Sequence, residues 1–322
     1  MSKPLLPIAM ITDENFILPT CVAIISLQHN MTADSQYEVN VLMAECSEQG
    51  EQTIVSLSKE RCPVKVIRVS LEKYSSIKQL AHISRACLLK FDICDLFPQY
   101  DKILYLDGDI IVRGDLYELF DTDLGDTYAA GVKELDCMME DKKNVNAGIM
   151  VFNAKKLRDE HLRDKLVETR ISLGDRGSMD QQTFNIVTGK NYTYLPIRYN
   201  CVPGKLIGKE KYPQYTTERL NQLYGCWYEN NEQVVENALI LHFATSNKPW
   251  NYTFGACAKE WFEYYKLSPY KKADIKRRGR WGYRVSKMKQ AWKRDGLKGC
   301  MERVKSHFQR QSQKNGDHVE WE

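Results

Sequence analysis

The chain has 322 residues, of which 43% are hydrophobic and 27% are charged, and its formal net charge is +4 at pH 7. This composition is ordinary for a globular protein, and it excludes a chain that is mainly disordered or mainly embedded in a membrane. The charge is uneven, because residues 271–305 contain 14 Lys or Arg against 3 Asp or Glu. We therefore expect a mildly acidic body and a strongly basic C-terminal segment.

The cysteines and the N-terminus indicate in which cellular compartment the protein lies. Ten cysteines are scattered along the chain without a C-x-x-C pair. A chain of this length does not need disulfides to fold, so we interpret them as reduced, mostly buried thiols, with a disulfide set as the alternative. The first apolar run ends at Asp13, which is too short for a secretory signal or a membrane span. The sequence therefore predicts a cytoplasmic protein.

Strand-like and helix-like stretches alternate through the first third of the chain. Predicted strands lie at residues 7–12, 37–45, 62–70 and 102–106, and predicted helices at residues 18–30, 47–60 and 83–100. This alternation predicts an α/β fold with a mostly parallel sheet covered by helices on both faces. No linker or repeat divides residues 1–265, which we interpret as one domain, with residues 266–322 as a basic accessory segment.

Polar side chains follow two of the predicted strands. Asp13 and Asn15 come directly after the first strand, and Asp107 and Asp109 come after the strand at residues 102–106. Ligands of such sheets bind beyond the carboxyl ends of the strands. We therefore expect these two groups to line one cleft.

Asp107 and Asp109 flank Gly108 in the sequence YLDGDIIV. Residues i and i+2 of an extended chain point to the same side, so both carboxylates would face one direction. At about 6 Å and an effective dielectric near 20, their charges repel by roughly 3 kcal/mol. A divalent cation such as Mg²⁺ or Mn²⁺ would relieve that repulsion. The alternative is a pair of solvated turn residues, because a D-x-D triplet alone is a weak signal.

His242 ends another apolar run, in the sequence LHFATSNKPW, and Lys248 follows six residues later. An imidazole is a suitable third ligand where Mn²⁺ is preferred, and a lysine there could meet a phosphate. Taken alone, His242 is more often a hydrogen-bonded structural residue. Together with the aspartates, the pattern suggests a metal that holds a diphosphate, with Lys248 helping to stabilise a leaving diphosphate.

Two further motifs are rich in amides. NVNAGIMVFN surrounds an apolar strand, and SMDQQTFN carries Asp180 and Gln181 at the predicted start of a helix. Asp180 could serve only to favour a helix N-terminus. A carboxylate beside an amide could also orient a hydroxyl-rich ligand or stabilise a positive centre.

Five motifs, taken in chain order, resemble glycosyltransferase family 8. They are ITDENFILPTCVAIISL, DKILYLDGDIIVRGDL, NAGIMVFN, DQQTFN and LHFATSNKPW. The resemblance is greatest to the bacterial lipopolysaccharide galactosyl- and glucosyltransferases, and it covers about residues 7–250. It implies a GT-A fold, which is a Rossmann-like, mixed but mostly parallel sheet flanked by helices. It also implies transfer of a hexose from UDP-galactose or UDP-glucose with retention of configuration, using Mn²⁺, with Mg²⁺ as the alternative.

The resemblance also assigns roles to residues. It implies that Asp107, Asp109 and His242 bind the metal, and that Asp180 and Gln181 are the catalytic pair. The residues that it implies in binding the sugar nucleotide are Ile11, Thr12, Asp13, Asn15, Lys90, Asp107, Gly108, Asp109, Asn146, Ala147 and Lys248.

Three positions depart from the family pattern. Lys90 stands where the family usually has an arginine, and a lysine offers a point charge without a bidentate fork. Thr245 stands where glycine is frequent. Gly108 lacks the side chain that would brush the ribose, so we expect that donor choice differs.

The basic segment shows apolar stripes at helical spacing, with Trp281 and Trp292 among many Lys and Arg. Such helices attach to anionic membrane surfaces, so residues 271–308 predict a peripheral protein on the inner face of the plasma membrane. The alternative is that these stripes dock on the catalytic domain. We do not expect nucleic-acid binding, because no recognition motif accompanies the charge.

The leading hypothesis is a hexosyltransferase that acts on a sugar hydroxyl of a lipopolysaccharide, lipooligosaccharide or other surface-glycan acceptor. The alternatives are a sugar-phosphate nucleotidyltransferase, for which ITDENF lacks a glycine-rich phosphate loop, and a non-catalytic sugar-nucleotide-binding protein. Retention allows a covalent glycosyl-enzyme or attack on the face that UDP leaves, and we favour the same-face route because no second carboxylate pair is evident. Glu134, Asp136 and residues 201–205 are unranked candidates for the acceptor side.

Overall fold

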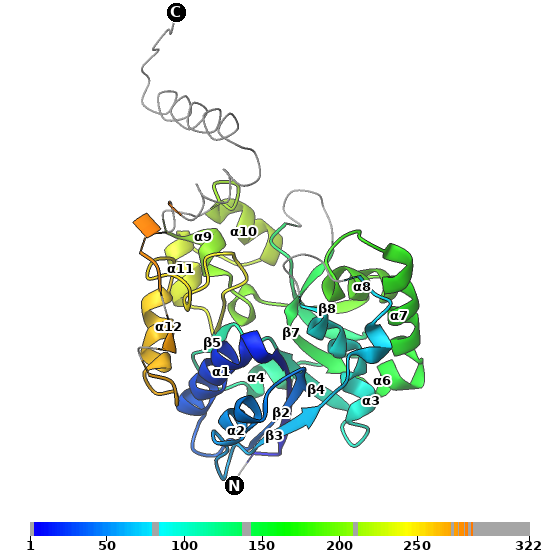
Figure 1. Cartoon of the computed structure of the whole chain (residues 1–322). Coiled ribbons are helices and arrows are strands. Elements are labelled where there is room, and N and C mark those ends of the chain that lie inside the picture. Colours follow the sequence, from blue (N-terminus) through cyan, green and yellow to red (C-terminus); the bar gives the residue numbers. More distant parts are fainter. Residues whose placement is uncertain are drawn as a thin grey trace, which may run out of the picture.

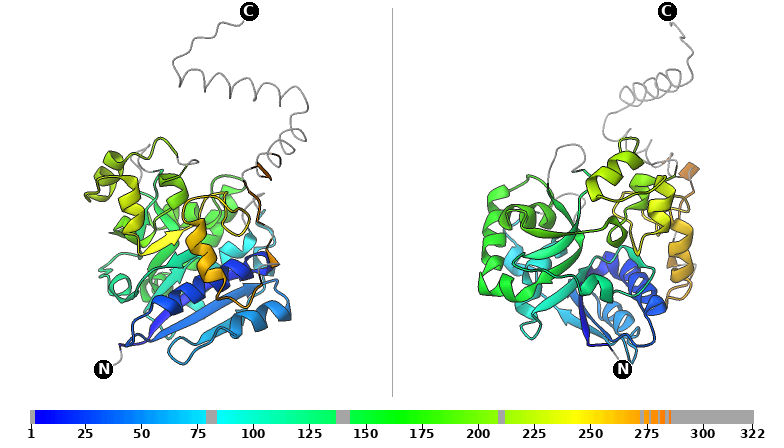
Figure 2. Two further views of the ribbon diagram at one scale, coloured as in Figure 1. Left: turned by 90° about the vertical axis from the view of Figure 1, so that its left-hand side faces the viewer. Right: turned by 180° about the vertical axis from the view of Figure 1, so that it is seen from behind.

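The computed structural model describes residues 3–78, 84–136, 143–208, 212–271, 274–275, 277–279, 281–282 and 285. A central sheet crosses the molecule and helices cover both of its faces (Figure 1). The C-terminal helices, coloured yellow-green to orange, gather at one side of this sandwich (Figure 2). The described part of the chain is therefore a three-layer α/β structure with an added helical region.

The main sheet has seven strands in the order β3-β2-β1-β4-β7-β6-β8. The strands are β1 (Leu6–Asp13), β2 (Tyr37–Ala44), β3 (Val64–Arg68), β4 (Lys102–Leu106), β6 (Ala129–Lys133), β7 (Val145–Asn153) and β8 (Tyr192–Leu195). Strand β7 is antiparallel to both of its neighbours, and the other pairs are parallel. The predicted mixed, mostly parallel sheet of a GT-A fold is thus confirmed. A second, two-stranded sheet pairs β5 (Ile110–Val112) with β9 (Ile240–His242).

The helices divide between the two faces of the sheet. They are α1 (Ile17–Asn30), α2 (Glu48–Val55), α3 (Ile93–Leu96), α4 (Tyr117–Phe120), α6 (Ala154–Asp159), α7 (Leu162–Leu173), α8 (Asp180–Val187), α9 (Pro203–Leu206), α10 (Thr217–Tyr224), α11 (Asn231–Glu236) and α12 (Ala258–Tyr265). Short 3₁₀ helices lie at Glu14–Phe16, Glu72–Tyr74, Arg85–Asp92 and Ile197–Tyr199. One apolar core lies under α1 and α2, a second under α3 and α6 to α8, and a third joins α9 to α12 to the β5–β9 pair.

The order of the strands places a crevice between β1 and β4. From β1 the chain runs outward through β2 and β3, and it then returns to form β4 on the other side of β1. At such a switch point the connections leave in opposite directions, so a crevice opens beyond the carboxyl ends of the two strands. Ala9 of β1 lies opposite Tyr105 of β4, so Asp13 and Asp109 both lie four residues further along, at this crevice.

The strands predicted from the sequence are confirmed, but the helix predicted at residues 83–100 is partly wrong. Its described part is a 3₁₀ helix over Arg85–Asp92, followed by only four residues of α-helix in α3. A 3₁₀ helix repeats every three residues. This repeat puts Cys87 and Lys90 on one face, and both line a cavity at the crevice.

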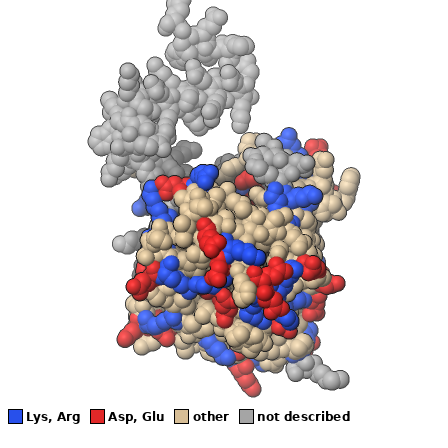
Figure 3. Space-filling view, turned by 90° about the vertical axis from the view of Figure 1, so that its right-hand side faces the viewer, with Lys and Arg blue, Asp and Glu red and all other residues tan. Residues whose placement is uncertain are grey.

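The surface over α6 and α7 mixes both signs of charge. Lys and Arg are interspersed with Asp and Glu across this face (Figure 3). On α6, Lys155 pairs with Asp159 and Lys156 pairs with Glu160, each one helical turn apart. Exposed pairs of this kind add little to stability.

The predicted membrane-surface segment at 271–308 lies almost wholly outside the described residues. At its start, Arg277 donates hydrogen bonds to the carbonyl oxygens of Pro249 and Tyr252, and its guanidinium lies 4.6 Å from the ring of Phe262. The first residues of the basic segment therefore pack on the domain that precedes it. Within the described residues, no helix is both long enough and apolar enough to cross a membrane. The eight cysteines among these residues are all free thiols.

Candidate active site

The crevice between β1 and β4 opens into two adjoining cavities. The first, of about 230 Å³, lies at the carboxyl end of β1, and the second, of about 330 Å³, lies toward β7 and α8. The two share Lys90, Asp107, Asp109 and Asp180 in their walls. These four charged side chains therefore stand between a pocket beside β1 and a pocket beside α8.

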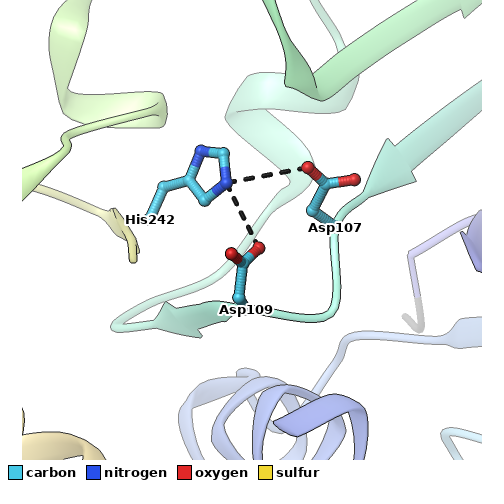
Figure 4. Close-up of side chains that lie close together, drawn as sticks. All are labelled: Asp107, Asp109 and His242. Carbon is cyan, nitrogen blue, oxygen red and sulfur yellow. Dashed lines mark ion pairs between the residues drawn. The ribbon is translucent and has the colours of Figure 1, made fainter. Parts of the chain in front are cut away.

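Asp107, Asp109 and His242 form a cluster at the centre of this crevice (Figure 4). Both aspartates come from the turn between β4 and β5, and the pairing of β5 with β9 sets Ile110 directly opposite His242. The Nε2 atom of His242 lies 3.6 Å from Oδ2 of Asp107 and 3.2 Å from Oδ1 of Asp109. One ligand atom from each residue lies within 4.8 Å of the others, which is close enough for one metal ion to contact all three.

Hydrogen bonds fix the tautomer of His242. The backbone N–H of Gly148 donates to Oδ1 of Asn146 at 3.0 Å, and this oxygen also accepts a bond from Nδ2 of Asn200 at 2.9 Å. Oδ1 of Asn200 is thereby turned toward Nδ1 of His242, at 2.9 Å. Since that oxygen can only accept, Nδ1 carries the proton and the lone pair of Nε2 faces the two aspartates. A histidine held in this way is prepared to bind a metal.

Two glycines leave the space that the cluster needs. A Cβ atom on Gly148 would lie 2.3 Å from Cε1 of His242 and 2.9 Å from Oδ2 of Asp107, so a side chain there would displace the imidazole. A Cβ atom on Gly108 would lie 2.4 Å from Oγ1 of Thr20 in α1. A Cβ atom at Gly108 would thus point toward α1. Glycine here allows α1 to approach the turn closely.

Each aspartate has one oxygen held by a fixed group and the other turned toward His242. Oδ2 of Asp109 accepts a hydrogen bond from Nζ of Lys248 at 2.5 Å, and Oδ1 of Asp107 accepts one from the hydroxyl of Tyr105, also at 2.5 Å. Burial raises the pKa of Asp109, but the ammonium of Lys248 outweighs it and holds this pKa well below its usual range. Burial raises the pKa of Asp107. Its nearest cation, Lys90, is 3.8 Å away and offsets only part of this effect, and the like charge of Asp109 raises the pKa further.

Lys90 connects the cluster to the predicted catalytic pair. Its side chain is 3% exposed, forms a close ion pair with Asp180, and donates to the carbonyl oxygen of Ala147 at 2.8 Å. Burial lowers the pKa of Lys90, but Asp180 and Asp107 outweigh it, so the pKa is raised and the ammonium stays charged. One cation therefore lies between two carboxylates, one on each side of the crevice.

Gln181 lies in a second network toward α8. Its Oε1 accepts from the backbone N–H of Ala147 at 3.2 Å, and its Nε2 donates to Oε2 of Glu134 at 3.2 Å. The same oxygen of Glu134 accepts from Asn146 at 2.7 Å, and Oε1 of Glu134 lies 3.0 Å from Nζ of Lys205. Burial raises the pKa of Glu134, but Lys205 and these hydrogen bonds outweigh it and lower the pKa. The carboxylate is therefore ionised and held in place.

Nearly all residues predicted for the site line the two cavities. Those in the first are Ile11, Thr12, Asp13, Lys90, Asp107, Gly108, Asp109 and Asp180. Those in the second are Lys90, Asp107, Asp109, Asn146, Ala147, Asp180, Gln181, His242 and Lys248. Asn15 lines neither: its side chain is exposed, and its backbone N–H donates to Oδ1 of Asp13. Asn15 therefore lies at the rim of the first cavity.

The sequence analysis did not predict the roles of Gly148 or Asn200, and it named Lys205 only among the unranked acceptor-side candidates at residues 201–205. Gly148 could have been found, because it completes the NAG motif whose first two residues were chosen. Asn200 follows a 3₁₀ helix and Lys205 lies in α9, and no sequence motif marks either residue. Only the folded chain brings them to His242 and Glu134.

A search against protein-family models matches the description "Glycosyl transferase family 8" over residues 7–254. The chain belongs to glycosyltransferase family 8. All the residues of the metal-ligand cluster and of the predicted catalytic pair lie within the matched span.

Similar curated proteins and solved structures extend this finding. Glycosyltransferase GlyE of Streptococcus pneumoniae is 32% identical over 188 residues, which are 58% of this chain and 42% of GlyE. Lipopolysaccharide 1,2-glucosyltransferase of Escherichia coli is 22% identical over 82% of this chain and 79% of the enzyme. Several streptococcal relatives are much longer proteins, of which the matched region spans less than half.

Two crystal structures show the same fold. The galactosyltransferase LgtC, solved with donor and acceptor sugar analogues, superposes with a TM-score of 0.68 at 21% identity, covering 84% of this chain and 98% of LgtC. GlyE superposes with a TM-score of 0.59 at 26% identity, covering 81% of this chain and 60% of GlyE. The family 8 fold therefore extends over most of the described residues.

Proposed function

We propose that this chain is a retaining glycosyltransferase that moves galactose or glucose from a UDP-sugar to a hydroxyl group of a saccharide or glycolipid. Family membership supports sugar transfer, and the lipopolysaccharide glucosyltransferases among its relatives support a surface-glycan acceptor. The observation that carries the proposal is the cluster of Asp107, Asp109 and His242, with the Nε2 lone pair turned toward two carboxylates. This ligand set lies at the crevice where sheets of this kind bind nucleotides.

The ligand set suits Mn²⁺, with Mg²⁺ as the alternative. Mg²⁺ prefers oxygen ligands, whereas Mn²⁺ accepts imidazole beside carboxylates. When bound, the cation would stabilise negative charge on the diphosphate as it leaves. Lys248 adds a second positive charge at the same place, because its ammonium lies against Asp109 and in the wall of the second cavity.

The first cavity is the proposed uridine site. Ile11, Thr12 and Asp13 end β1 and line this cavity, and Asp13 can accept hydrogen bonds from the base or the ribose. Asn15 would contact the nucleotide only from the rim. This arrangement leaves the second cavity, beside α8, for the two sugars.

The favoured reaction is attack on the face that the diphosphate leaves. The bond between C1 of the sugar and the diphosphate oxygen breaks, the acceptor oxygen bonds to C1 on the same face, and the hydroxyl proton passes to the leaving oxygen. Asp180 would stabilise the positive charge at C1, because its carboxylate is held by buried Lys90 rather than free to form a covalent bond. Gln181 would orient the sugars, since both ends of its amide are already fixed.

Mass spectrometry of a UDP-sugar panel with Mn²⁺ tests this proposal. We expect hydrolysis of UDP-galactose or UDP-glucose to UDP and free hexose, with Asp109→Asn as the inactive control. When pyrophosphate is also supplied, conversion of the UDP-sugar and pyrophosphate to UTP and hexose 1-phosphate would instead indicate a nucleotidyltransferase. Binding of a UDP-sugar without any turnover would indicate a non-catalytic binding protein.

The proposed membrane attachment rests on the sequence of residues 271–308 alone. We expect that removing residues 286–322 weakens binding to anionic liposomes and leaves UDP-sugar hydrolysis unchanged, because Arg277 and its contacts with the catalytic domain are kept. Equal liposome binding by the full and shortened chains would contradict this part of the proposal.

A further inference from the structure

A wide groove lies outside the crevice, over α10 and the N-terminus of α11. It encloses about 1010 Å³. Its lining residues are Tyr212, Pro213, Tyr215, Thr216, Thr217, Glu218, Asn221, Gln222, Cys226, Trp227, Tyr228, Glu229, Asn230, Asn231 and Glu232. None of the roles proposed above uses these residues.

Trp227 is the most unusual residue of this groove, because its side chain is 88% exposed. An indole in water leaves a large apolar surface uncovered. The backbone around it is nevertheless fixed: Oδ1 of Asn221 accepts from the N–H of Tyr228 and Nδ2 of Asn221 donates to the Tyr228 carbonyl, both at 2.9 Å. Gly225, with φ of 61°, ends α10 and turns the chain into this loop. The exposed ring is therefore held on a rigid support.

The lining has the chemistry of a saccharide site. Trp227 and Tyr212 present exposed aromatic rings, and the C–H faces of a pyranose ring stack on such surfaces. Gln222, Glu218 and Glu229 are exposed beside them and offer groups that bond to hydroxyls. Among the described residues, the lining contains no Lys or Arg, so this part of the groove does not suit a phosphate, a nucleotide or an anionic lipid.

A short seam of contacts joins the groove to the crevice. The hydroxyl of Tyr215, which lines the groove, donates a close hydrogen bond to Asp136, which lines the second cavity. Lys205, also in the second cavity, lies 5.6 Å from the ring of Tyr215 and 3.0 Å from Glu134. Buried Tyr215 therefore connects the wall of the second cavity to the wall of the groove, so the two lie side by side.

We propose that this groove binds further hexose units of the acceptor glycan, with Trp227 as the stacking surface, so that the protein prefers an oligosaccharide to a single sugar. The inference rests on the proposed function, because the reacting end of the acceptor would lie in the second cavity and the rest of the acceptor would extend from there into the groove. It predicts a binding site whose affinity rises with the number of sugar units.

Binding of two oligosaccharide series tests the inference. The probes are α-linked glucose and β-linked galactose chains of one to six units. Calorimetric titration of the full chain measures binding in every variant, and tryptophan fluorescence follows it in the proteins that keep Trp227. The variants are Trp227→Ala and, as the matched control, Trp281→Ala, which removes a tryptophan that is 78% exposed and lies outside the groove. Tyr212→Ala is a second groove variant in case Trp227→Ala does not fold, and thermal unfolding reports folding for each.

In at least one series, we expect the native chain and Trp281→Ala to bind six units at least about tenfold more tightly than one. Trp227→Ala and Tyr212→Ala should lose most of this dependence on length. Hydrolysis of the UDP-sugar without acceptor should be equal in all four proteins, because the groove lies outside the donor site.

Each other outcome overturns a defined part of the account. If the protein hydrolyses the UDP-sugar but its affinity for sugars does not rise with chain length in either series, the groove inference alone is overturned. Dependence on length that Trp227→Ala and Tyr212→Ala retain also overturns it, because the sugars then bind elsewhere. Displacement of the Trp227 signal by a decalysine peptide, but not by sugars, replaces the glycan with a basic protein partner. Length-dependent binding without any UDP-sugar hydrolysis leaves the groove intact and overturns the proposed function.

Discussion

The two cavities of the crevice are built in different ways. The cavity beside β1 and the metal-ligand cluster take their residues from the ends of strands, where Asp13 ends β1, Asp107 follows β4 and His242 ends β9. The cavity beside α8 takes Glu134 from the loop after β6 and Lys205 from the short helix α9, which a hydrogen-bonded network holds together. The first set is positioned by sheet topology, and the second depends on tertiary contacts.

The two sets also differ in charge. The metal-ligand cluster brings two carboxylates together and compensates them with Lys90 and Lys248. In the other cavity, Glu134 is already paired with Lys205 and bonded to two amides. The first arrangement suits a ligand with high charge, and the second suits neutral hydroxyl groups. Substitutions on the two sides should therefore affect different steps.

The largest effect is expected from Asp109→Asn. It removes a metal ligand and leaves Lys248 without its carboxylate partner. Loss of several kcal/mol of charge stabilisation should lower UDP-sugar hydrolysis by about 10³-fold. Hydrolysis rates with saturating Mn²⁺ check this prediction. A variant that keeps more than a tenth of the native rate would show that Asp109 is not a ligand.

Lys90→Met should lower UDP-sugar hydrolysis nearly as much as Asp109→Asn does, and it should also lower the free energy of unfolding. It would leave Asp180 and Asp107 without their shared cation, and breaking a buried ion pair costs about 3–5 kcal/mol. Lys90→Arg, which keeps the charge, is the matched control and should lose less of both stability and activity. Urea unfolding and hydrolysis assays measure the two effects, and equal losses in both variants would contradict this role.

The contribution of Lys90 to stability should also depend on pH. Its pKa is raised in the folded chain, so its stabilisation is fully present below the unfolded pKa of about 10.4 and is lost as the pH rises through the higher folded value. The stability difference between the native chain and Lys90→Met should therefore be constant from pH 7 to 9. A difference that falls within this range would mean that the ammonium deprotonates early.

These predictions differ in how far the sequence alone supports them. Asp107, Asp109 and His242 could be predicted because each follows an apolar run that forms a strand, and strand ends meet at one edge of a sheet. The 3₁₀ helix at Arg85–Asp92 could not be predicted, because burial of Lys90 against Asp180 overrides the α-helical pattern of that stretch. The contact between Asn200 and His242 depends on residues 42 positions apart, and no local pattern encodes it.

Asn200→Ala tests the contact that the sequence did not reveal. Without Asn200, Nδ1 of His242 loses its acceptor and the ring is free to change tautomer. Loss of such a support typically lowers metal affinity by about 10- to 100-fold. Calorimetric titration with Mn²⁺ measures the change. Asn237→Ala, which removes an exposed asparagine at the end of α11, is the control and should bind Mn²⁺ normally.

The smallest effect is expected from Glu134→Gln, on the acceptor side. The change keeps the shape of the side chain but removes the charge that Lys205 neutralises. A charged hydrogen bond contributes about 1.5–3 kcal/mol, so sugar transfer should fall by about tenfold or more. UDP-sugar hydrolysis without acceptor should change little. A parallel loss of hydrolysis would mean that Glu134 serves the donor side, and the distinction between the two cavities would fail.

The central claim is that Asp107, Asp109 and His242 form a metal site that holds the diphosphate of a sugar nucleotide. Calorimetric titration of UDP into the native chain and into His242→Ala, each with and without Mn²⁺, tests it most directly. We predict that Mn²⁺ tightens UDP binding to the native chain by about 5- to 150-fold, and that His242→Ala loses most of this coupling. UDP binding that is equally tight with and without Mn²⁺ in the native chain would contradict the claim.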